Sequence, residues 1–198
     1  NISKSVHTSM ALAIVGGVIV MVLGFVSARP VLVAMSVPAE ILDDALLYMN
    51  VYYAGIIANM IYNVGTGILR AIGDSRMPLY VLIVCCLANV VLDLLFVVVF
   101  HWAVFGVAFA TVLPQVISAV LIMARLMLTH ESYRVELRKI RFDAGILRNV
   151  IRIGLPAGLQ SVMYSFSNIF IQASINGFGT DAIAAWAAIG KIDGFIWM

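Results

Sequence analysis

Long apolar runs limit this chain to one class of fold more sharply than any other feature of its sequence. Several runs reach or exceed the roughly 20 residues that a helix needs to cross a bilayer, and they lack the short alternating pattern of an outer-membrane barrel. Hydrophobic residues make up 63% of the chain and charged residues only 11%, unlike soluble globular domains. The sequence therefore predicts an all-α integral membrane protein, a polytopic helix bundle. The predicted spans are 9–28, 45–69, 77–100, 103–124, 153–176 and a sixth that begins at 182.

The basic residues give the bundle an orientation. When the runs are threaded alternately through the bilayer, Lys4, Arg70, Arg76 and all the basic residues of 125–152 fall on one side. Lys and Arg collect on the cytoplasmic side of a membrane, so this side is predicted to be the cytoplasm. The same bias explains why these residues are basic, so no nucleic-acid partner is needed to account for them. In the long polar segment, Asp143 is a candidate N-cap for a short amphipathic helix on the membrane surface.

A carboxylate in the middle of the third run is the first candidate functional residue. Asp93 follows Asn89 by four residues, so both side chains lie on one face of a helix. An acid at this depth costs roughly 2.5 to 3.5 kcal/mol to insert, and an intramembrane carboxylate indicates an ion or proton site by default. The alternative is a neutral acid that is hydrogen-bonded for packing alone.

Polar side chains form stripes along three further runs at helical spacing. The stripes are Tyr48, Tyr52, Asn59, Asn63, Thr66 and Arg70; Thr111, Gln115 and Ser118; and Ser161, Ser165, Asn168, Gln172 and Asn176. Such residues can be interhelical hydrogen-bond contacts only. Together with the polar face of Asn89 and Asp93, these three stripes favour a water-filled cavity between the helices.

The depths of the two amides suggest a common site. At 1.5 Å per residue, Asn89 lies roughly 18 Å and Asn63 roughly 14 Å from the cytoplasmic ends of their helices. If these helices are antiparallel neighbours, the amides meet Asp93 near the bilayer middle, as a Na⁺ or proton site requires. Lys191 and Asp193 also fall near mid-membrane in the sixth run, where they could line the cavity or bond to a neighbouring helix.

Enzyme classes find little support in the sequence. It contains no Gly-rich phosphate loop, its histidines have no metal-ligand spacing, and no serine, histidine and acid are arranged for nucleophilic catalysis. No cofactor is predicted.

Residues 67–78, Gly-Ile-Leu-Arg-Ala-Ile-Gly-Asp-Ser-Arg-Met-Pro, resemble the turn between the fourth and fifth helices of the multidrug and toxic compound extrusion (MATE) family. Residues 89–93, Asn-Val-Val-Leu-Asp, resemble its fifth helix in the DinF-like branch, and 153–160 and 175–179 resemble the start and end of its seventh helix. The resemblance covers essentially the whole chain, as a fragment with helices three to seven and part of eight.

The resemblance implies twelve helices in two six-helix lobes that face a central cavity. Residues 1–128 would be helices three to six of the N-lobe, 129–152 the cytoplasmic connector with its amphipathic helix, and 153–198 the start of the C-lobe. The family works as a cation-coupled antiporter. Its N-lobe cation site resembles what Asn63, Asn89 and Asp93 would supply, together with an aspartate on helix one.

These observations predict a multidrug efflux antiporter in the cytoplasmic (inner) membrane of a bacterium, coupled to H⁺ or Na⁺ and monomeric at full length. Asn63, Asn89 and Asp93 are the predicted cation site, where Na⁺ could bind, and the substrate is predicted to be an amphipathic organic cation. The predicted substrate cavity is lined by Tyr52, Asn59, Gln115, Ser165, Asn168 and Gln172. The alternative is a lipid-linked oligosaccharide or peptidoglycan-precursor flippase of the same superfamily, which would be expected to carry more arginine in the cavity.

Overall fold

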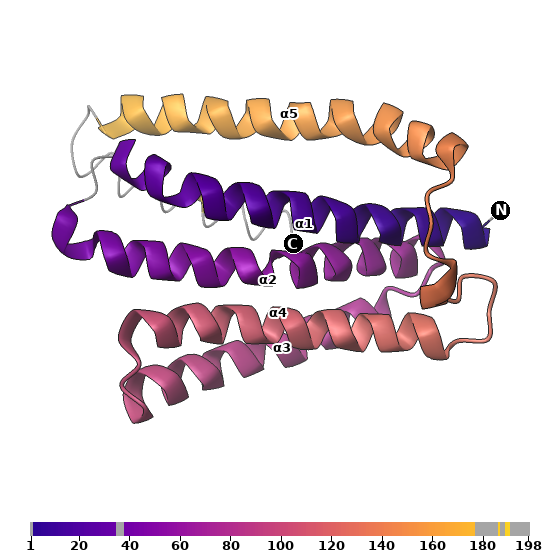
Figure 1. Ribbon diagram of the computed structural model, residues 1–198, viewed down its shortest axis with the longest axis horizontal. Coiled ribbons are helices and arrows are strands. Elements are labelled where there is room, and N and C mark those ends of the chain that lie inside the picture. Colours follow the sequence, from indigo (N-terminus) through magenta and orange to yellow (C-terminus); the bar gives the residue numbers. More distant parts are fainter. Residues whose placement is uncertain (1, 35–37, 177–185, 187–188, 191–198) are drawn as a thin grey trace. The chain divides into compact units, whose positions relative to one another are not determined.

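The computed structural model describes residues 2–34, 38–176, 186 and 189–190. The described residues form helices and the segments that join them, with no strand among them (Figure 1). The elements are α1 (Ile2–Ala34), α2 (Ala39–Ala71), α3 (Arg76–Leu94), the π-helix η1 (Leu95–Val99), α4 (Ala103–Leu128), the 3₁₀ helix η2 (Leu137–Lys139) and α5 (Ala144–Asn176). The all-α prediction is confirmed.

Four of the expected spans are helices long and apolar enough to cross a membrane. They are Ile2–Ala34, Ala39–Ala71, Arg76–Val99 and Val104–Leu128. The second is longer than its apolar run because Glu40, Asp43 and Asp44, expected to precede it, lie in its first turns. Acidic side chains are favourable there, since the N-terminal end of a helix carries partial positive charge.

The segment after α4 differs from the expectation. A short surface helix and a separate span from 153 were predicted, but α5 runs without a break from Ala144 through Arg152 to Asn176. Arginine is a good helix former, so Arg148 and Arg152 do not interrupt the helix. Asp143 is confirmed as its N-cap, because Asp143 Oδ1 accepts from the backbone N–H of Gly145 at 3.1 Å and of Ile146 at 3.2 Å. The sixth run lies almost wholly outside the described residues, as do Lys191 and Asp193.

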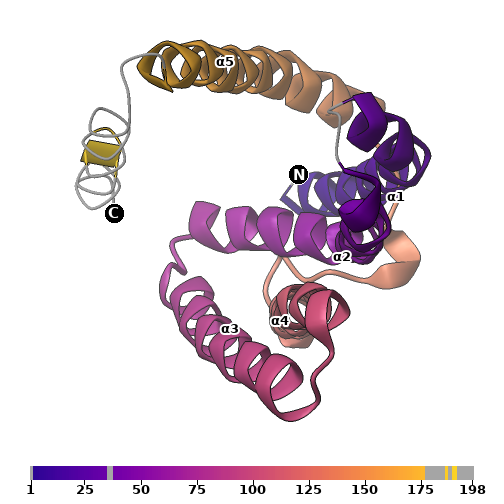
Figure 2. The ribbon, with the colours of Figure 1, turned by 90° about the vertical axis from the view of Figure 1, so that its left-hand side faces the viewer.

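The chain divides into two compact units, Asn1–Leu147 and Arg148–Met198, and each is described by itself. In the first unit, α2 packs against both α1 and α4, whereas α3 packs chiefly against α4 and only sparsely against α2 (Figure 2). The second unit contains most of α5.

Glycines bring α2 and α4 into close contact. A Cβ atom added at Gly55 would lie 2.6 Å from Val112 Cγ1, and one added at Gly65 would overlap Ile122 Cγ2. Small residues of this kind let transmembrane helices approach closely enough to gain dispersion energy, since lipid supplies no hydrophobic drive between helices.

The apolar core of the first unit gathers at one end. We call this the connector end: the start of α1, the turn between α2 and α3, the end of α4, and residues 129–143, the connector. Its buried cluster contains Val6, Met10, Ala13, Leu69, Val81, Cys85, Ile122, Leu126 and Val135. The ion pair between Arg125 and Asp74, with 3.6 Å between Nη2 and Oδ2, joins the end of α4 to the α2–α3 turn.

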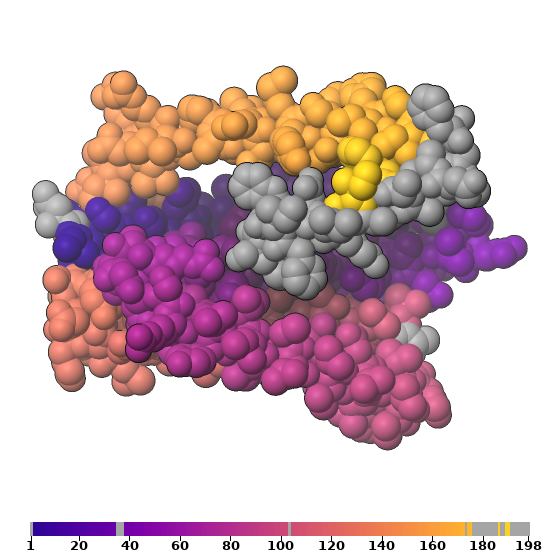
Figure 3. Space-filling model, turned by 180° about the vertical axis from the view of Figure 1, so that it is seen from behind, coloured from indigo at the N-terminus to yellow at the C-terminus, as the bar shows by residue number. Residues whose placement is uncertain are grey.

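By contrast, α3 has a long exposed face, and part of the magenta surface in Figure 3 belongs to this helix. The large side chains exposed along it are apolar. Leu87 is 63% and Val91 is 61% exposed. Exposed leucine and valine along a whole helix suit contact with lipid or with other transmembrane helices. The predicted site residues of α3 therefore lie on a helix of which only one side is covered within this unit.

Candidate functional site

Asp93 occupies the last turn of α3, just before the π-helix η1. The residue is half-buried, and its Oδ1 atom is buried without a hydrogen-bond partner among the described residues. A buried oxygen without a partner costs about 1–3 kcal/mol, so it needs a reason to persist. A carboxylate oxygen of this kind within a spanning helix is the default sign of a proton or cation site, and that role stays a prediction for Asp93.

An aromatic cluster accompanies the change in helical geometry after Asp93. Phe96 in η1 stacks on Trp102, with ring centroids 5.3 Å apart and planes 9° apart, and also contacts Phe109 on α4. The turn between them passes through His101 at a positive φ of 55°. A π-helical turn is frequent at functional sites, and here it lies within two residues of the predicted acid.

Asn89 connects α3 to α4. Its Nδ2 donates to the backbone carbonyl of Ala110 at 2.9 Å. This bond crosses between two transmembrane helices, so it matches the packing alternative for small polar residues. Because Nδ2 is the donor, the Oδ1 atom of the same amide stays available as an acceptor or ligand.

Asn63 turns toward its own helix instead. Its Nδ2 donates to the Oδ1 of Asn59 at 2.8 Å and to the Asn59 carbonyl oxygen at 2.9 Å. The structure thus joins one predicted cation ligand to one predicted cavity residue. Within the described ranges, no hydrogen bond links any two of Asn63, Asn89 and Asp93. The common site for all three stays a prediction.

The two faces of α2 and α4 are chemically distinct. A groove of about 520 Å³ between these helices is lined only by apolar side chains, among them Ile57 and Ile61 on α2 and Val120 on α4. Residues two positions apart on a helix lie about half a turn apart, so Ile57 and Ile61 face away from Asn59 and Asn63. The polar stripe and the apolar groove therefore lie on opposite sides of α2.

The remaining predicted cavity residues are divided between the two units. Tyr52 is 39% exposed and contacts the Tyr53 ring edge-on, and Gln115 is half-buried on α4. Ser165, Asn168 and Gln172 lie on the part of α5 that belongs to the second unit. Ser165 Oγ donates to the Ser161 carbonyl on its own helix at 3.0 Å. Whether these residues share a cavity stays a prediction.

The donor set suits a hard monovalent cation or a proton better than a transition metal. Asp93 and the two amides offer oxygen ligands, and the part of the chain that the structure describes contains no group of three or more His, Cys, Asp or Glu that could hold a metal ion. Binding of either ion at Asp93 would neutralise the carboxylate.

Two further polar residues, which no local sequence pattern marked, lie buried at the start of α1. His7 is 4% and Thr8 is 1% exposed. His7 Nδ1 lies 2.6 Å from the Ser3 carbonyl oxygen, and Nε2 accepts from the Glu136 backbone N–H at 3.1 Å. Thr8 Oγ1 accepts from the Asp143 N–H at 3.2 Å and donates to the Arg141 carbonyl at 3.4 Å. Their partners on the connector are more than a hundred residues away, so no local pattern could reveal them.

Two acids of the connector have a lowered pKa. The backbone N–H of Ile146 stabilises the Asp143 carboxylate and lowers its pKa below the usual range, and Lys4 acts in the same direction. The side chain of Lys139 lowers the pKa of Glu136 by donating a hydrogen bond. Both acids are therefore charged near neutral pH.

Known proteins with similar sequences include transporters of one family. Residues 1–95 match the MatE family model. The chain is 24% identical over 200 residues to probable multidrug resistance protein YoeA of Bacillus subtilis, covering 98% of this chain and 43% of YoeA. It is 27% identical over 174 residues to probable multidrug resistance protein YpnP of the same organism, covering 87% and 38% of the two chains. The chain thus spans about two fifths of the length of these curated relatives.

A solved transporter structure is also similar to this chain. A MOP-superfamily transporter from Pyrococcus furiosus, described as having a binding pocket of reverse polarity that suggests a different function, is 26% identical with a TM-score of 0.85. The match covers 96% of this chain and 43% of that one. The relatives are bacterial or archaeal membrane transporters, and the described helices include four that can span a membrane. The chain is therefore similar to MATE-type membrane transporters, and its residues 1–95 match the family model.

Proposed function

We propose that the protein is a cation-coupled multidrug efflux antiporter in which Asp93 exchanges its coupling ion, H⁺ or Na⁺, against the substrate. The observation that carries this proposal is the buried Oδ1 of Asp93, which has no partner among the described residues although it sits in an apolar spanning helix. The relatives named as multidrug resistance proteins support the transport class. A transporter needs such a site near mid-membrane, whereas an enzyme would need a catalytic pair or metal ligands.

The proposed exchange depends on the charge of one carboxylate. When a proton or Na⁺ binds, Asp93 becomes neutral and its desolvation cost falls, which favours the conformation in which the site is closed. When the ion leaves, the charged carboxylate attracts an organic cation. Through its hydrogen bond to the Ala110 carbonyl, Asn89 would transmit a conformational change of α3 to α4. Asn63 would reach the site by exchanging its bond to Asn59 for one to the ion.

The proposed substrate is an amphipathic organic cation. Its charge would be met by Asp93, and its apolar part by aromatic and aliphatic walls such as Tyr52, which is 39% exposed. Ser165, Asn168 and Gln172 would contribute from α5 if the C-lobe closes the same cavity.

Replacing Asp93 tests the proposal. In the intact protein, Asp93→Asn should reduce ion-driven efflux of a fluorescent organic cation to background while leaving membrane expression unchanged. Asp44→Asn is the matched control, since Asp44 is an exposed acid in the first turns of α2, and it should transport normally. Efflux is measured in membrane vesicles under a Na⁺ gradient and, separately, under a proton gradient, which identifies the coupling ion. Full efflux by Asp93→Asn under both gradients would refute the role of Asp93.

The flippase alternative has one weak point in the geometry. A pyrophosphate-linked substrate calls for basic residues within the cavity, and Arg70, the basic residue of the α2 stripe, lies exposed in the last turn of its helix. Lys191 lies outside the described residues. Stimulation of lipid-linked precursor translocation, without organic-cation efflux, would favour the flippase instead.

A further inference from the structure

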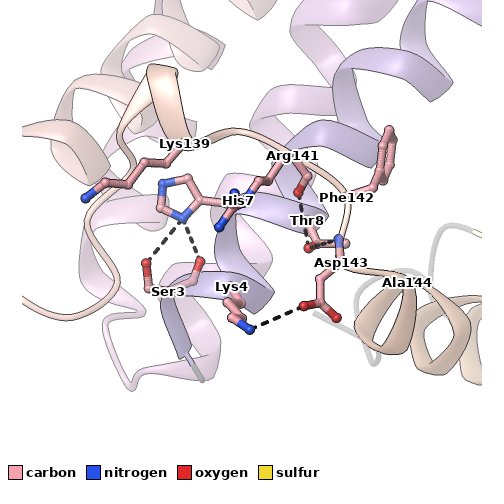
Figure 4. A pocket seen from close by; sticks show the side chains of 9 residues that line it. All are labelled: Ser3, Lys4, His7, Thr8, Lys139, Arg141, Phe142, Asp143 and Ala144. Carbon is pink, nitrogen blue, oxygen red and sulfur yellow. Dashed lines mark hydrogen bonds and ion pairs between the residues drawn. The ribbon is translucent and has the colours of Figure 1, made fainter.

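A second cavity lies at the connector end, away from Asp93. It has a volume of about 370 Å³, within the roughly 300–1,000 Å³ of small-molecule sites. Figure 4 shows that the start of α1 forms one wall and the connector the other. The lining residues are Ser3, Lys4, His7, Thr8, Lys139, Arg141, Phe142, Asp143 and Ala144.

The charge of this cavity is predominantly positive. Three of the lining side chains, Lys4, Lys139 and Arg141, are cationic, against one carboxylate, Asp143. Lys4 meets Asp143 at 3.6 Å with both side chains exposed, a pair that is worth little. Lys139 lies 2.8 Å from Glu136, three residues earlier on the connector. Arg141 has no ion-pair partner among the described residues.

The single carboxylate that lines the cavity, that of Asp143, already has partners within the protein. Asp143 Oδ1 accepts from two backbone N–H groups at the start of α5, and Oδ2 faces Lys4. The same contacts lower its pKa, so the carboxylate remains an N-cap at neutral pH. The cations are therefore only partly neutralised by the protein itself.

Buried polar contacts hold the backbone that carries the basic side chains in place. His7 accepts from the Glu136 N–H, and Thr8 bonds to the Arg141 carbonyl and the Asp143 N–H, so α1 fixes the connector on both sides of Lys139 and Arg141. A mobile loop would have to lose conformational entropy before binding an anion. Here the backbone that carries the cations is already ordered.

The length of α1 would bring the cavity to the level of the lipid headgroups. At 1.5 Å per residue, α1 is about 50 Å long, compared with about 40–45 Å for a bilayer with its headgroups. Its first two turns, with Lys4, His7 and Thr8, therefore reach the headgroup layer. The rim carries an apolar side chain that suits the adjacent acyl boundary, because Phe142 lines the cavity and is 45% exposed.

We infer that this cavity binds the phosphate of an anionic phospholipid from the cytoplasmic leaflet, with Lys139 and Arg141 as the principal contacts and Lys4 as the third. The ligand chemistry is a phosphodiester with net negative charge. A lipid fits better than free phosphate, because a small soluble anion has no apolar part to contact the apolar rim. Anchoring in the membrane also raises the local concentration of the lipid. The inference does not depend on the transport activity.

The test measures lipid proximity directly. In the intact protein, Phe142→Trp places an indole at the rim, and the signal of the native tryptophans is subtracted with the parent protein. The protein is reconstituted in vesicles of phosphatidylcholine and phosphatidylglycerol in equal parts, with bromine on the acyl chains of either one. Brominated phosphatidylglycerol should quench the introduced indole more strongly than brominated phosphatidylcholine.

Two matched charge deletions separate a site from general electrostatics. Lys139→Gln with Arg141→Gln should reduce the preference for phosphatidylglycerol by roughly fivefold for each residue removed. Arg70→Gln with Arg76→Gln removes the same charge from exposed residues at the same end but outside the cavity, and should leave the preference intact. An equal loss in both pairs would mean that net charge alone attracts the lipid, and would overturn the inference.

Two further arms complete the test. Quenching by brominated phosphatidylcholine should be the same in all variants, which shows that each is folded and inserted to the same depth. Inorganic phosphate added to the vesicles should leave the phosphatidylglycerol preference unchanged. If phosphate abolishes it, the cavity is a site for a free anion and the lipid assignment is wrong.

Discussion

The connector end and the surroundings of Asp93 are built in opposite ways. At the connector end, four helices and the connector share one buried cluster, and the polar side chains of His7 and Thr8 find partners across the fold. Around Asp93, the helix is covered on one side only, and a buried carboxylate oxygen lacks a partner among the described residues. The first region is a packed core, while the second leaves a carboxylate oxygen without a partner among the described residues, as the proposed ion site requires.

This difference follows from the tasks proposed for the two regions. Residues that break a local stability rule tend to sit at functional sites, where the cost is offset elsewhere in the fold. An ion-exchange site must be able to gain and lose its ligand, so complete satisfaction within the protein would remove its function. Substitutions in the two regions should therefore have opposite effects on stability.

The largest loss of stability is expected for a substitution in the buried cluster of the connector end. Leu126→Ala should lower the free energy of unfolding by about 2–5 kcal/mol, because a fully buried leucine leaves a cavity. Leu128→Ala is the matched control two residues later, since Leu128 is 77% exposed and Leu126 0%. Thermal unfolding of the purified protein in detergent gives both values. Equal midpoints for the two variants would show that the connector end is not a packed core.

The opposite sign is expected at Asp93. Asp93→Leu should raise the free energy of unfolding by about 1–3 kcal/mol, because it removes a buried polar oxygen without a partner among the described residues, while abolishing efflux. Asp74→Leu serves as comparison, since Asp74 pairs with Arg125 and accepts from the Met77 N–H; it should lower stability. A fall in stability for Asp93→Leu in the absence of Na⁺ would mean that Asp93 has a structural partner after all.

A smaller loss is expected where α1 holds the connector. Thr8→Val conserves shape but removes two hydrogen bonds, to Arg141 and Asp143, and should cost about 1–2 kcal/mol. The variant should also speed hydrogen exchange at the amide of Asp143. Ser5→Ala changes an exposed hydroxyl one turn earlier on the same helix and should have no measurable effect. Unchanged exchange in Thr8→Val would show that the connector is held by other contacts.

The smallest effect concerns acid pH. The pKa of Asp143 is lowered in the folded protein, first by the Ile146 N–H. Its contribution to stability is therefore complete above its unfolded pKa of about 4 and is lost as the pH falls through the lower, folded value. Asp143→Asn keeps an oxygen for the cap but cannot titrate, so the acid-induced loosening at Gly145 and Ile146 should diminish.

The measurement for this last prediction is hydrogen exchange at those two amides across acid pH, corrected for the intrinsic pH dependence of exchange. The same acid-induced loosening in the parent protein and in the Asp143→Asn variant would assign the effect to another group, with Glu136 the first candidate because its pKa is also lowered.

Local patterns were sufficient for the helices and for single residues of the site. Apolar runs located four spanning helices because a bilayer requires every backbone group to bond within its own helix. The N-cap at Asp143 was predicted because a cap needs only its own first turn. Asp93 stood out because a carboxylate in an apolar run is costly wherever the neighbouring helices lie. The helix start expected near 153 was wrong, since α5 begins at Ala144 and continues through Gly154 and Pro156.

By itself, then, the sequence determined the helical membrane fold, the basic end of the bundle and the presence of Asp93 within an apolar span, because these depend on spacing within one segment. Only the tertiary structure decided which side chains meet: Asn89 with the Ala110 carbonyl, Asn63 with Asn59, and His7 and Thr8 with a connector more than a hundred residues later. The physical reason is that helix–helix packing selects partners by the shape of whole surfaces, and no local repeat in the chain encodes that choice.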